Sequence, residues 1–288
     1  WASSGNAESG RLVSKHEGIT KVLGGNEANA ILANEMTFKW LSRKSINYRE
    51  SILYLGAFHN LSSYIIRTKY FNKFKWGGDI DSYIFDINSN EGNLNKTYNI
   101  DYLVKQVYID FLNPFQYLAA FSYLKYLYKG ESKFVLPVIN IGKVKYLPSF
   151  RMGLTPFGSE FYFENFALYN DRVINAYYRK GDRTFHKFSG FGIRVSNLLN
   201  VKAASVDMKI DCWNQPGLYL GGSTISKARD GFGYALYETL YLKLINGDFP
   251  VSIVSQIGYK TAGYLEGEKL SDGLILRFGL SLSESKSK

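Results

Sequence analysis

The residues best suited to chemistry lie near the N-terminus, in KHEGITKVLGGNEANAILANE, residues 15–35. His16 and Glu17 match the opening of HExxH, a motif in which two histidines one helical turn apart bind zinc and the glutamate activates water. The position four residues after His16 is Thr20, and a hydroxyl is a poor replacement for an imidazole ligand. The motif is therefore incomplete.

Other side chains could complete such a site. We expect Glu17 to act as the general base, with zinc as the cofactor and with His16 as a ligand that is assisted by Glu27, Glu35 or His59. In the alternative interpretation, His16 and Glu17 are an ordinary pair on a helix surface and His59 is a packed or exposed histidine.

Weaker patterns are present elsewhere. Ser159, Ser189 and His186 could be arranged into a hydrolase, but the chain has no G-x-S-x-G motif. The segment GYLEGEKLSDG, residues 263–273, lacks the spacing of a calcium loop and is expected to be solvated. Gly24-Gly25 is expected to break a helix, with Asn26 capping the next one.

These residues belong to a mainly helical domain predicted over residues 1–132. Helices are expected at residues 26–41 and 48–71, followed by a loop with a short strand near residues 76–93. Residues 101–130 predict two helices that meet at Asn113-Pro114, because the residue before proline avoids helical geometry.

From residue 133 to residue 288 the apolar residues recur at every second position. The segment LILRFGLSLS, residues 274–283, places four leucines and Phe278 on one side and Arg277 with small residues on the other. About eight segments of this kind are separated by short turns such as YND and NGD, which are typical of antiparallel hairpins.

Composition indicates which face points inward. The apolar faces are nearly unbroken Leu, Ile, Val, Phe and Tyr, while the opposite faces mix Gly, Ser and Ala with charges, which suits a narrow, hydrogen-bonded lumen. The sequence therefore predicts an α+β protein, in which a transmembrane β-barrel of about eight antiparallel strands follows the helical domain. A soluble β domain is the alternative. The charges expected to pair within the lumen are Arg151, Asp207, Lys209, Asp211, Lys243 and Arg277.

Charge and composition limit the partners. The net charge of +10 suits anionic lipid, but no run of like charges and no nucleic-acid-binding signature is present, so no nucleic-acid partner is expected.

The longest uncharged apolar stretch, residues 111–124, is too short for an ordinary spanning helix. Cys212 is the single cysteine and is expected to be a buried or lipid-facing thiol. The first residues, WASSGNAESG, fit a mature protein after signal-peptide removal or a shortened chain.

Two segments carry a family resemblance. LPSFRMGLTPFGSEFYFENFALY, residues 147–169, and GYKTAGYLEGEKLSDGLILRFGLSL, residues 258–282, resemble the closing region of a family of uncharacterised bacterial outer-membrane proteins. The resemblance implies a membrane-embedded barrel with a helical region and a peptidase-like histidine-glutamate motif. His16 and Glu17 match that motif, whereas Thr20 departs from it.

Three functional hypotheses follow. In the first, the chain is a bacterial outer-membrane barrel with a metal-dependent hydrolase or peptidase activity, and its partners are the lipid bilayer and lipopolysaccharide. In the second, it is a non-catalytic transport or ligand-binding barrel whose helices form a plug or gate. In the third, it is a soluble helical-plus-β protein that binds an anionic partner.

Overall fold

The computed structural model describes residues 13–71, 78–90, 98–182, 186–201, 203–221, 224–228, 230–245 and 251–282. Its N-terminal part is helical. The helices are α1 (Lys15–Arg43), α2 (Tyr48–Phe58), α3 (Asn60–Phe71), α4 (Asp79–Asn90), α5 (Ile100–Val107), the 3₁₀ helix η1 (Tyr108–Leu112) and α6 (Pro114–Lys129). No helix among the described residues combines the length and apolar character needed to cross a membrane.

The strands begin at residue 45 and dominate the chain after residue 132. They are β1 (Ser45–Asn47), β2 (Lys133–Val135), β3 (Ile139–Ile141), β4 (Val144–Thr155), β5 (Gly158–Tyr169), β6 (Arg172–Gly181), β7 (Ser189–Val201), β8 (Ala204–Gln215), β9 (Tyr219–Leu220), β10 (Ser226–Lys227), β11 (Gly231–Ile245), β12 (Val251–Lys260) and β13 (Gly273–Leu282).

Helix α1 is continuous, contrary to the expected break at Gly24-Gly25. The Ser14 side chain accepts from the Glu17 backbone N–H and the Glu17 side chain accepts from the Ser14 N–H, which forms a capping box. The helix ends at Lys44 in the left-handed conformation. Two glycines cost a helix about 2 kcal/mol relative to alanine, and packing of α1 against the sheet and α2 can outweigh that cost.

The remaining helices differ from the prediction in two places. The region predicted as one helix over residues 48–71 is divided at His59, and the region expected to be a loop contains α4. The break at Asn113-Pro114 is confirmed. Asn113 caps α6 by accepting from the Phe115 backbone N–H, and Pro114 occupies the first helical turn, where its missing N–H has no cost.

Nine strands form one antiparallel sheet, in the order β13-β12-β11-β8-β7-β6-β5-β4-β3. Chain neighbours pair as hairpins, apart from the excursion that forms the separate β9-β10 ribbon between β8 and β11. The turn between β5 and β6 has Asn170 and Asp171 at positive φ, as a type I′ hairpin requires. The other turn singled out in the sequence, NGD at residues 246–248, lies outside the described residues.

The sheet is curved but is not closed into a barrel, with β13 and β3 at its two edges. The predicted α+β class and antiparallel strands are thus confirmed, but the predicted closure is not. At the β4 edge, the helical region takes the place of a closing strand: the Met152 backbone N–H donates to the Asp110 side chain on η1, at 2.8 Å. The outward side chains of Met152 and Leu154 pack in a core with residues of α1, α3, α4 and α5.

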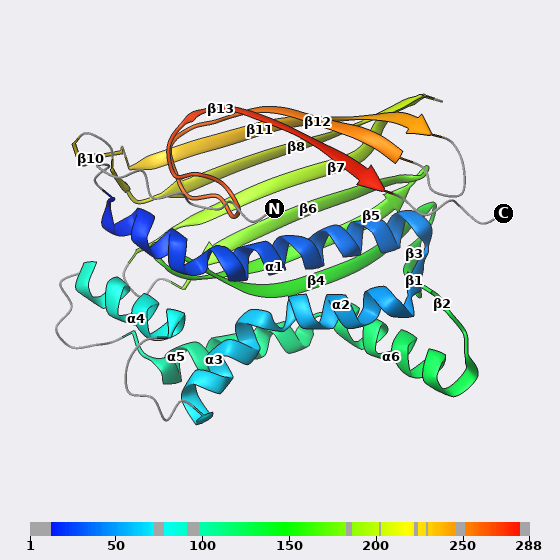
Figure 1. Ribbon diagram of the computed structural model, residues 1–288, viewed down its shortest axis with the longest axis horizontal. Helices are drawn as coiled ribbons and strands as arrows, with labels where there is room; N and C mark the ends of the chain where they lie inside the picture. Colours follow the sequence, from blue (N-terminus) through cyan, green and yellow to red (C-terminus); the bar gives the residue numbers. More distant parts are fainter. Residues whose placement is uncertain are drawn as a thin grey trace.

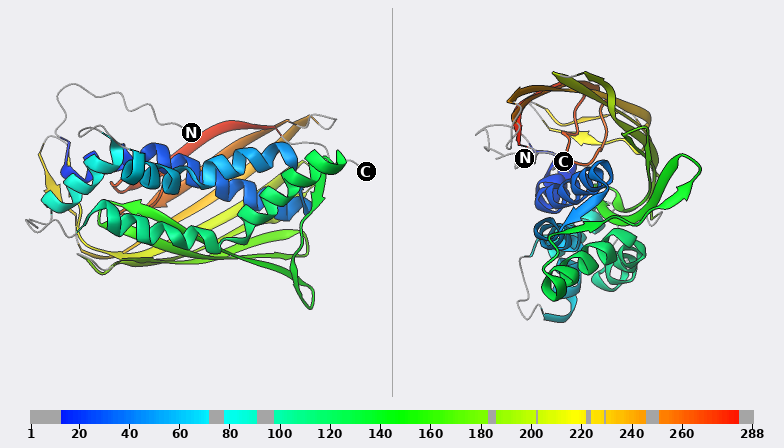
Figure 2. Two further views of the ribbon diagram at one scale, coloured as in Figure 1. Left: turned by 90° about the horizontal axis from the view of Figure 1, so that it is seen from below. Right: turned by 90° about the vertical axis from the view of Figure 1, so that its right-hand side faces the viewer.

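The sheet curls into an open trough, and α1 runs along the open side of that trough (Figures 1 and 2). The other helices lie beyond α1 on the side of β4. One hydrophobic core joins α1, α2 and α6 to the inward residues Leu147, Phe166 and Val173 of β4, β5 and β6. This packing fixes α1 against one half of the concave face.

Strand β13 shows which side chains lie on the outer face of the sheet and which lie on the inner face. Leu276 and Leu280 of β13 point away from the trough and are 56% and 71% exposed. Arg277 points inward, where it donates to Gln256 and Glu268. The outward positions of the other late strands follow the same rule. Exposed outward side chains include Phe191, Phe232, Tyr234, Leu236, Leu242, Ile253, Ile257, Tyr259, Leu274 and Phe278.

Candidate functional site

A cavity of about 40 Å³ lies between α1, α2, η1, β4 and the loop that joins β12 to β13. Its lining mixes small, polar and charged side chains. The lining residues are Leu23, Asn26, Glu27, Ala30, Ala33, Asn34, Thr37, Tyr54, Ala57, Phe58, Leu61, Asp110, Asn113, Ser149, Arg151, Met152, Gly153, Leu154, Glu164 and Glu266.

Helix α1 contributes one face to this cavity. Asn26, Ala30, Ala33 and Thr37 recur at three- and four-residue steps, so they lie above one another on the helix. The two alanines leave room between α1 and β4 that larger side chains would fill. The helical spacing of these four residues therefore marks a face of α1 that lines the cavity and also packs in the hydrophobic core.

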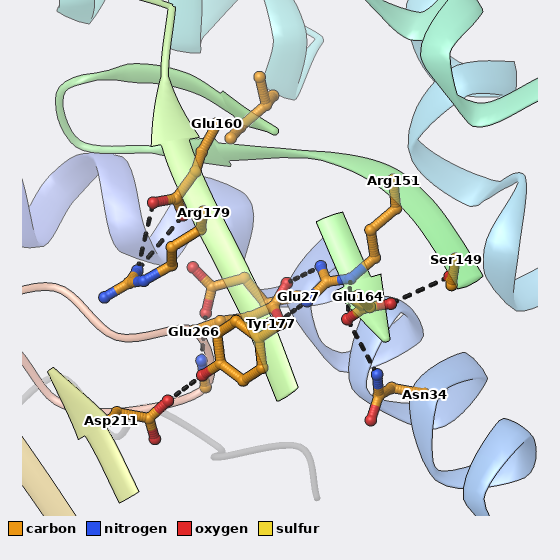
Figure 3. A network of polar contacts seen from close by, with 12 residues as sticks. Glu27, Asn34, Ser149, Arg151, Glu160, Glu164, Tyr177, Arg179, Asp211 and Glu266 are labelled. Atoms are coloured by element: carbon orange, nitrogen blue, oxygen red, sulfur yellow. Dashed lines mark hydrogen bonds and ion pairs between the residues drawn. The ribbon is translucent and has the colours of Figure 1, made fainter. Parts of the chain in front are cut away.

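Arg151 is the centre of the polar network on the sheet side of the cavity (Figure 3). Its two terminal nitrogens donate to the two carboxylate oxygens of Glu266, both at 2.8 Å, and its Nε donates to Glu164 at 3.2 Å. The guanidinium also stacks over the Tyr162 ring, 3.6 Å from the centroid. Bidentate and stacked contacts of this kind fix the orientation of arginine.

Glu164 links the network to α1 and to the cap of α6. It accepts from Asn34 at 3.1 Å and from the Ser149 hydroxyl at 3.0 Å. The side-chain NH₂ of Asn113 donates to Ser149 Oγ, at 3.1 Å, while its oxygen caps α6. One asparagine thus begins a helix and positions a hydroxyl at the cavity wall.

Two further carboxyl groups in the lining have raised pKa values. Burial and the nearby Glu266 raise the pKa of Glu27 to about 7, although Tyr264 Oη and the Gly267 backbone N–H both donate to its carboxylate. Burial also raises the pKa of Asp110 to about 7. The cavity therefore contains two groups that exchange protons near neutral pH.

The trough continues into a second layer of buried polar contacts (Figure 3). Arg179 pairs with Glu160 at 3.3 Å, and the Tyr177 hydroxyl donates to Asp211. Inward glycines on β7 make room for these β6 side chains, since a Cβ at Gly192 would lie 2.3 Å from the Tyr177 ring. The interior is filled by its own side chains.

Most of the predicted lumen charges do lie in this interior, and one pair forms within the predicted set, whereas the other charges have partners outside it. Lys209 and Asp211 pair with each other at 3.1 Å. Asp207 lies 3.7 Å from Arg194. Arg151 and Arg277 pair with glutamates that were not among the candidates, Glu266 and Glu268 among them. Lys243 is exposed near the end of β11, where the strand extends past the filled part of the trough.

His16 and Glu17 have a structural use near the N-terminus of α1. The Tyr219 backbone N–H donates to His16 Nδ1 at 2.9 Å, so the ring proton is assigned to Nε2, which then has no lone pair to offer a metal. Burial, His186 and Lys15 lower the pKa of His16 to about 4. The Glu17 carboxylate accepts from the Ser14 and Gly221 N–H groups, in each case through Oε2. Together, His16 and Glu17 anchor the segment that follows β8.

The structure does not bring the four predicted zinc ligands together. At 1.5 Å per residue along α1, His16 and Glu27 are roughly 16 Å apart, whereas zinc lies about 2 Å from each ligand. Glu35 pairs with Arg194, and His59 ends α2 beside Ser62. Within the ranges that the structure describes, no three His, Cys, Asp or Glu side chains are grouped to hold a metal ion.

The serine-histidine candidates are also used elsewhere. The Ser159 hydroxyl is completely buried and contacts Tyr98 and Asp182, at 2.9 and 2.6 Å. His186 lies edge-on to the Phe157 ring. The contacts of Ser159 tie the start of β5 to Tyr98, which precedes α5, and to Asp182, which follows β6.

The sequence reading missed the loop between β12 and β13, which folds into the trough and does not project into solvent (Figure 1). Tyr264, Leu265 and Leu270 are buried there. Gln215 binds both the N–H and the carbonyl of Tyr264, at 2.8 and 2.7 Å. Three apolar side chains within a supposedly solvated loop were the signal that could have identified it.

Comparison of this chain with protein-family models, with curated proteins and with solved structures found no match.

Proposed function

We propose that this chain is a barrel-like protein of the bacterial outer membrane, in which strands β4 to β8 and β11 to β13 are the membrane-spanning segments. The observation that supports this most directly is the distribution of side chains across one sheet: large apolar groups are exposed on the convex face, and charged groups are buried on the concave face. Contiguous exposed apolar surface is uncommon on monomeric soluble proteins.

Strand dimensions agree with this proposal. These eight strands contain 10 to 15 residues each, and a tilted transmembrane strand needs about 9 to 11. Longer strands would extend beyond the hydrocarbon, as the exposed Lys243 does. Outward apolar and inward polar alternation is the pattern of membrane barrels.

The helical region extends the apolar exterior beyond the open side of the sheet. Phe111 and Leu112 on η1, and Phe121 and Leu124 on α6, are all exposed. In hydrocarbon every backbone polar group needs an internal partner, and helices satisfy their own. The helices would therefore close the wall on the side where β4 has no complete strand partner.

The activity that this arrangement favours is ligand binding or transport without catalysis, with α1 and the β12–β13 loop acting as a plug. Ion pairs fill the trough, and the cavity is the remaining space beside α1. Its lining has four carboxyl groups, Glu27, Asp110, Glu164 and Glu266, and a single guanidinium. Such a surface, rich in carboxyl oxygens, suits a small ligand that is rich in hydrogen-bond donors.

The membrane assignment is tested by spin labels on the full chain in lipid, in a Cys212→Ala background. Labels at Leu276 and Leu280 should be reached by oxygen dissolved in the hydrocarbon, whereas a label at the inward Ser281 should not. Water contact at both leucine positions would overturn the proposal.

Ligand binding is tested by titration with methylammonium: Ala30→Leu, which narrows the cavity, should abolish binding, and Ala28→Leu, outside the lining, should not. Equal binding by both variants would assign the ligand elsewhere.

A second candidate function is acid–base hydrolysis inside the cavity, supported by the two carboxyl groups, Glu27 and Asp110, whose pKa lies near 7. A pKa near the working pH favours general acid–base catalysis. Wild type and Glu27→Gln should be compared on fluorogenic peptide and phospholipid substrates. Turnover that is lost in Glu27→Gln would favour this candidate, and absence of turnover in wild type would count against it.

A further inference from the structure

Lysines are concentrated in one short part of the chain. Residues 125–145 are rich in lysine at both ends and contain one acidic residue, Glu131. The lysines are Lys125, Lys129, Lys133, Lys143 and Lys145. Helix α4 has the opposite character, with three aspartates and no basic residue in its twelve positions. The net positive charge of the protein is therefore distributed unevenly along the chain.

The fold places residues 125–145, which we call the basic rim, at one end of the trough. The rim consists of the last turns of α6, strands β2 and β3, and the start of β4. Strand β2 pairs with β1, directly after α1, and β3 pairs with β4. The β3–β4 hairpin projects from the curved wall (Figure 2), and α4 lies at the other end of the molecule (Figure 1).

The basic rim is also apolar. Lys129, Lys133 and Lys143 are exposed, and Lys125 lies 2.6 Å from Glu131. Between the lysines, Tyr128 is 94% exposed. Large apolar side chains elsewhere in the rim are exposed as well: Leu127, Val135, Ile139 and Ile141. Exposed charged and apolar groups thus alternate along the basic rim.

We propose that the basic rim binds the phosphate-bearing head groups of membrane lipids. This inference rests on the proposed function, because it requires the spanning strands to hold the rim at the level of the head groups. The apolar side chains would lie at the boundary of the acyl chains, while the lysine stems lie along that boundary and place their ammonium groups among phosphates.

The interleaved apolar groups favour lipid over nucleic acid. A nucleic-acid duplex would neutralise the lysines but would leave Val135, Ile139 and Ile141 in water. A lipid interface satisfies both kinds of side chain at once. Each lysine near an anionic membrane surface contributes about 1 kcal/mol, so several acting together give a measurable preference.

The experiment uses the full chain, which is purified in detergent and immobilised. Its affinity for lipid A is measured by titration with fluorescent lipid A in mixed micelles. The test variant replaces four rim lysines by glutamine: Lys129, Lys133, Lys143 and Lys145. We expect its affinity to fall about 30-fold or more, and we expect micelles of dephosphorylated lipid A to bind wild type equally weakly. The matched control replaces four exposed lysines at the other end: Lys21, Lys187, Lys227 and Lys269. Both variants carry the same net charge, and the control should change affinity less than about 3-fold.

Equal affinities for the two variants would overturn the inference. Competition by millimolar inorganic phosphate would show a site for free anions, and competition by DNA would show a nucleic-acid surface; either outcome also overturns it. Thermal unfolding of both variants reports whether they fold. Because the micelle titration does not require insertion of the strands, a loss of head-group binding can be distinguished from failure of the spin-label test.

Discussion

On β13, Leu276 and Arg277 are chain neighbours with opposite environments: the leucine faces outward and is exposed, and the arginine faces the trough and donates to Glu268 at 2.7 Å. The same contrast separates the outer and inner faces of the whole late sheet. In a soluble protein the apolar face would be the buried one. Here the interior is polar, so its stability depends on the pairing of each charge.

The two faces should therefore respond differently to the same kind of change. An inner substitution leaves a buried partner without its counter-charge, whatever surrounds the protein. An outer substitution alters only the contact between side chain and surroundings, so its effect reports whether those surroundings are lipid or water.

The largest effect is expected on the inner face. Arg151→Met would leave Glu164 and Glu266 buried without their cation, and loss of one partner of a buried ion pair costs about 3–5 kcal/mol. Denaturant unfolding in detergent measures the change. The control, Lys243→Met at an exposed position, should stay within about 0.5 kcal/mol. Similar losses in the two variants would contradict the importance of pairing.

On the outer face, Leu276→Lys should destabilise the protein in lipid by about 2–4 kcal/mol if the residue lies near the bilayer midplane. The cost arises because hydrocarbon does not solvate an ammonium group. Reversible unfolding from lipid vesicles measures it, and Leu276→Phe, which stays apolar, is the matched control. A change below about 0.5 kcal/mol in Leu276→Lys would place this face in water.

Proton binding by Glu27 gives a smaller, pH-dependent effect. Burial raises its pKa from 4.5 to about 7, so the folded state binds the proton more tightly than the unfolded state. The corresponding stability is fully present below about pH 4.5 and is lost as the pH rises towards 7. Glu27→Gln should remove this loss and stabilise the protein at pH 8 by about 1–3 kcal/mol. Measurement of the unfolding free energy from pH 4 to pH 8 checks this prediction. If the free energy of Glu27→Gln changed with pH in parallel with that of wild type, the prediction would be contradicted.

The smallest effect concerns Glu238, an exposed outward acid on β11. Acidic groups cost less than lysine on a lipid-facing surface, so Glu238→Leu should stabilise the protein in lipid by about 1 kcal/mol. In water, the same change should be close to neutral. The measurement compares the unfolding free energies of Glu238→Leu and wild type, first in lipid vesicles and then in aqueous buffer at low detergent concentration.

Much of the sheet was predictable because alternation is local. The outward positions of residues 274–282 and the inward Arg277 follow from the two-residue period alone. Closure was not predictable, because it depends on whether the edge of β4 meets a strand or a helix. In the structure it meets η1, through Asp110, and no local pattern encodes that contact.

The site was predicted less completely than the fold. Glu27 was singled out as a metal ligand and lies in the cavity, but with Tyr264 and Gly267 as its partners. His16 and Glu17 attracted attention through a motif, yet their spacing along the chain does not reveal that they bind backbone N–H groups of a distant segment. Long-range partners of this kind are decided by how the chain packs.

The contact between Glu27 and the β12–β13 loop also has a kinetic consequence. Its two hydrogen bonds join residues separated by 237 and 240 positions, and contacts between distant positions slow folding because long loops must close first. During synthesis, α1 would emerge long before the groups that complete its surroundings. Until residues 264–267 arrive, several of its polar side chains would need water or an assembly factor to accompany them.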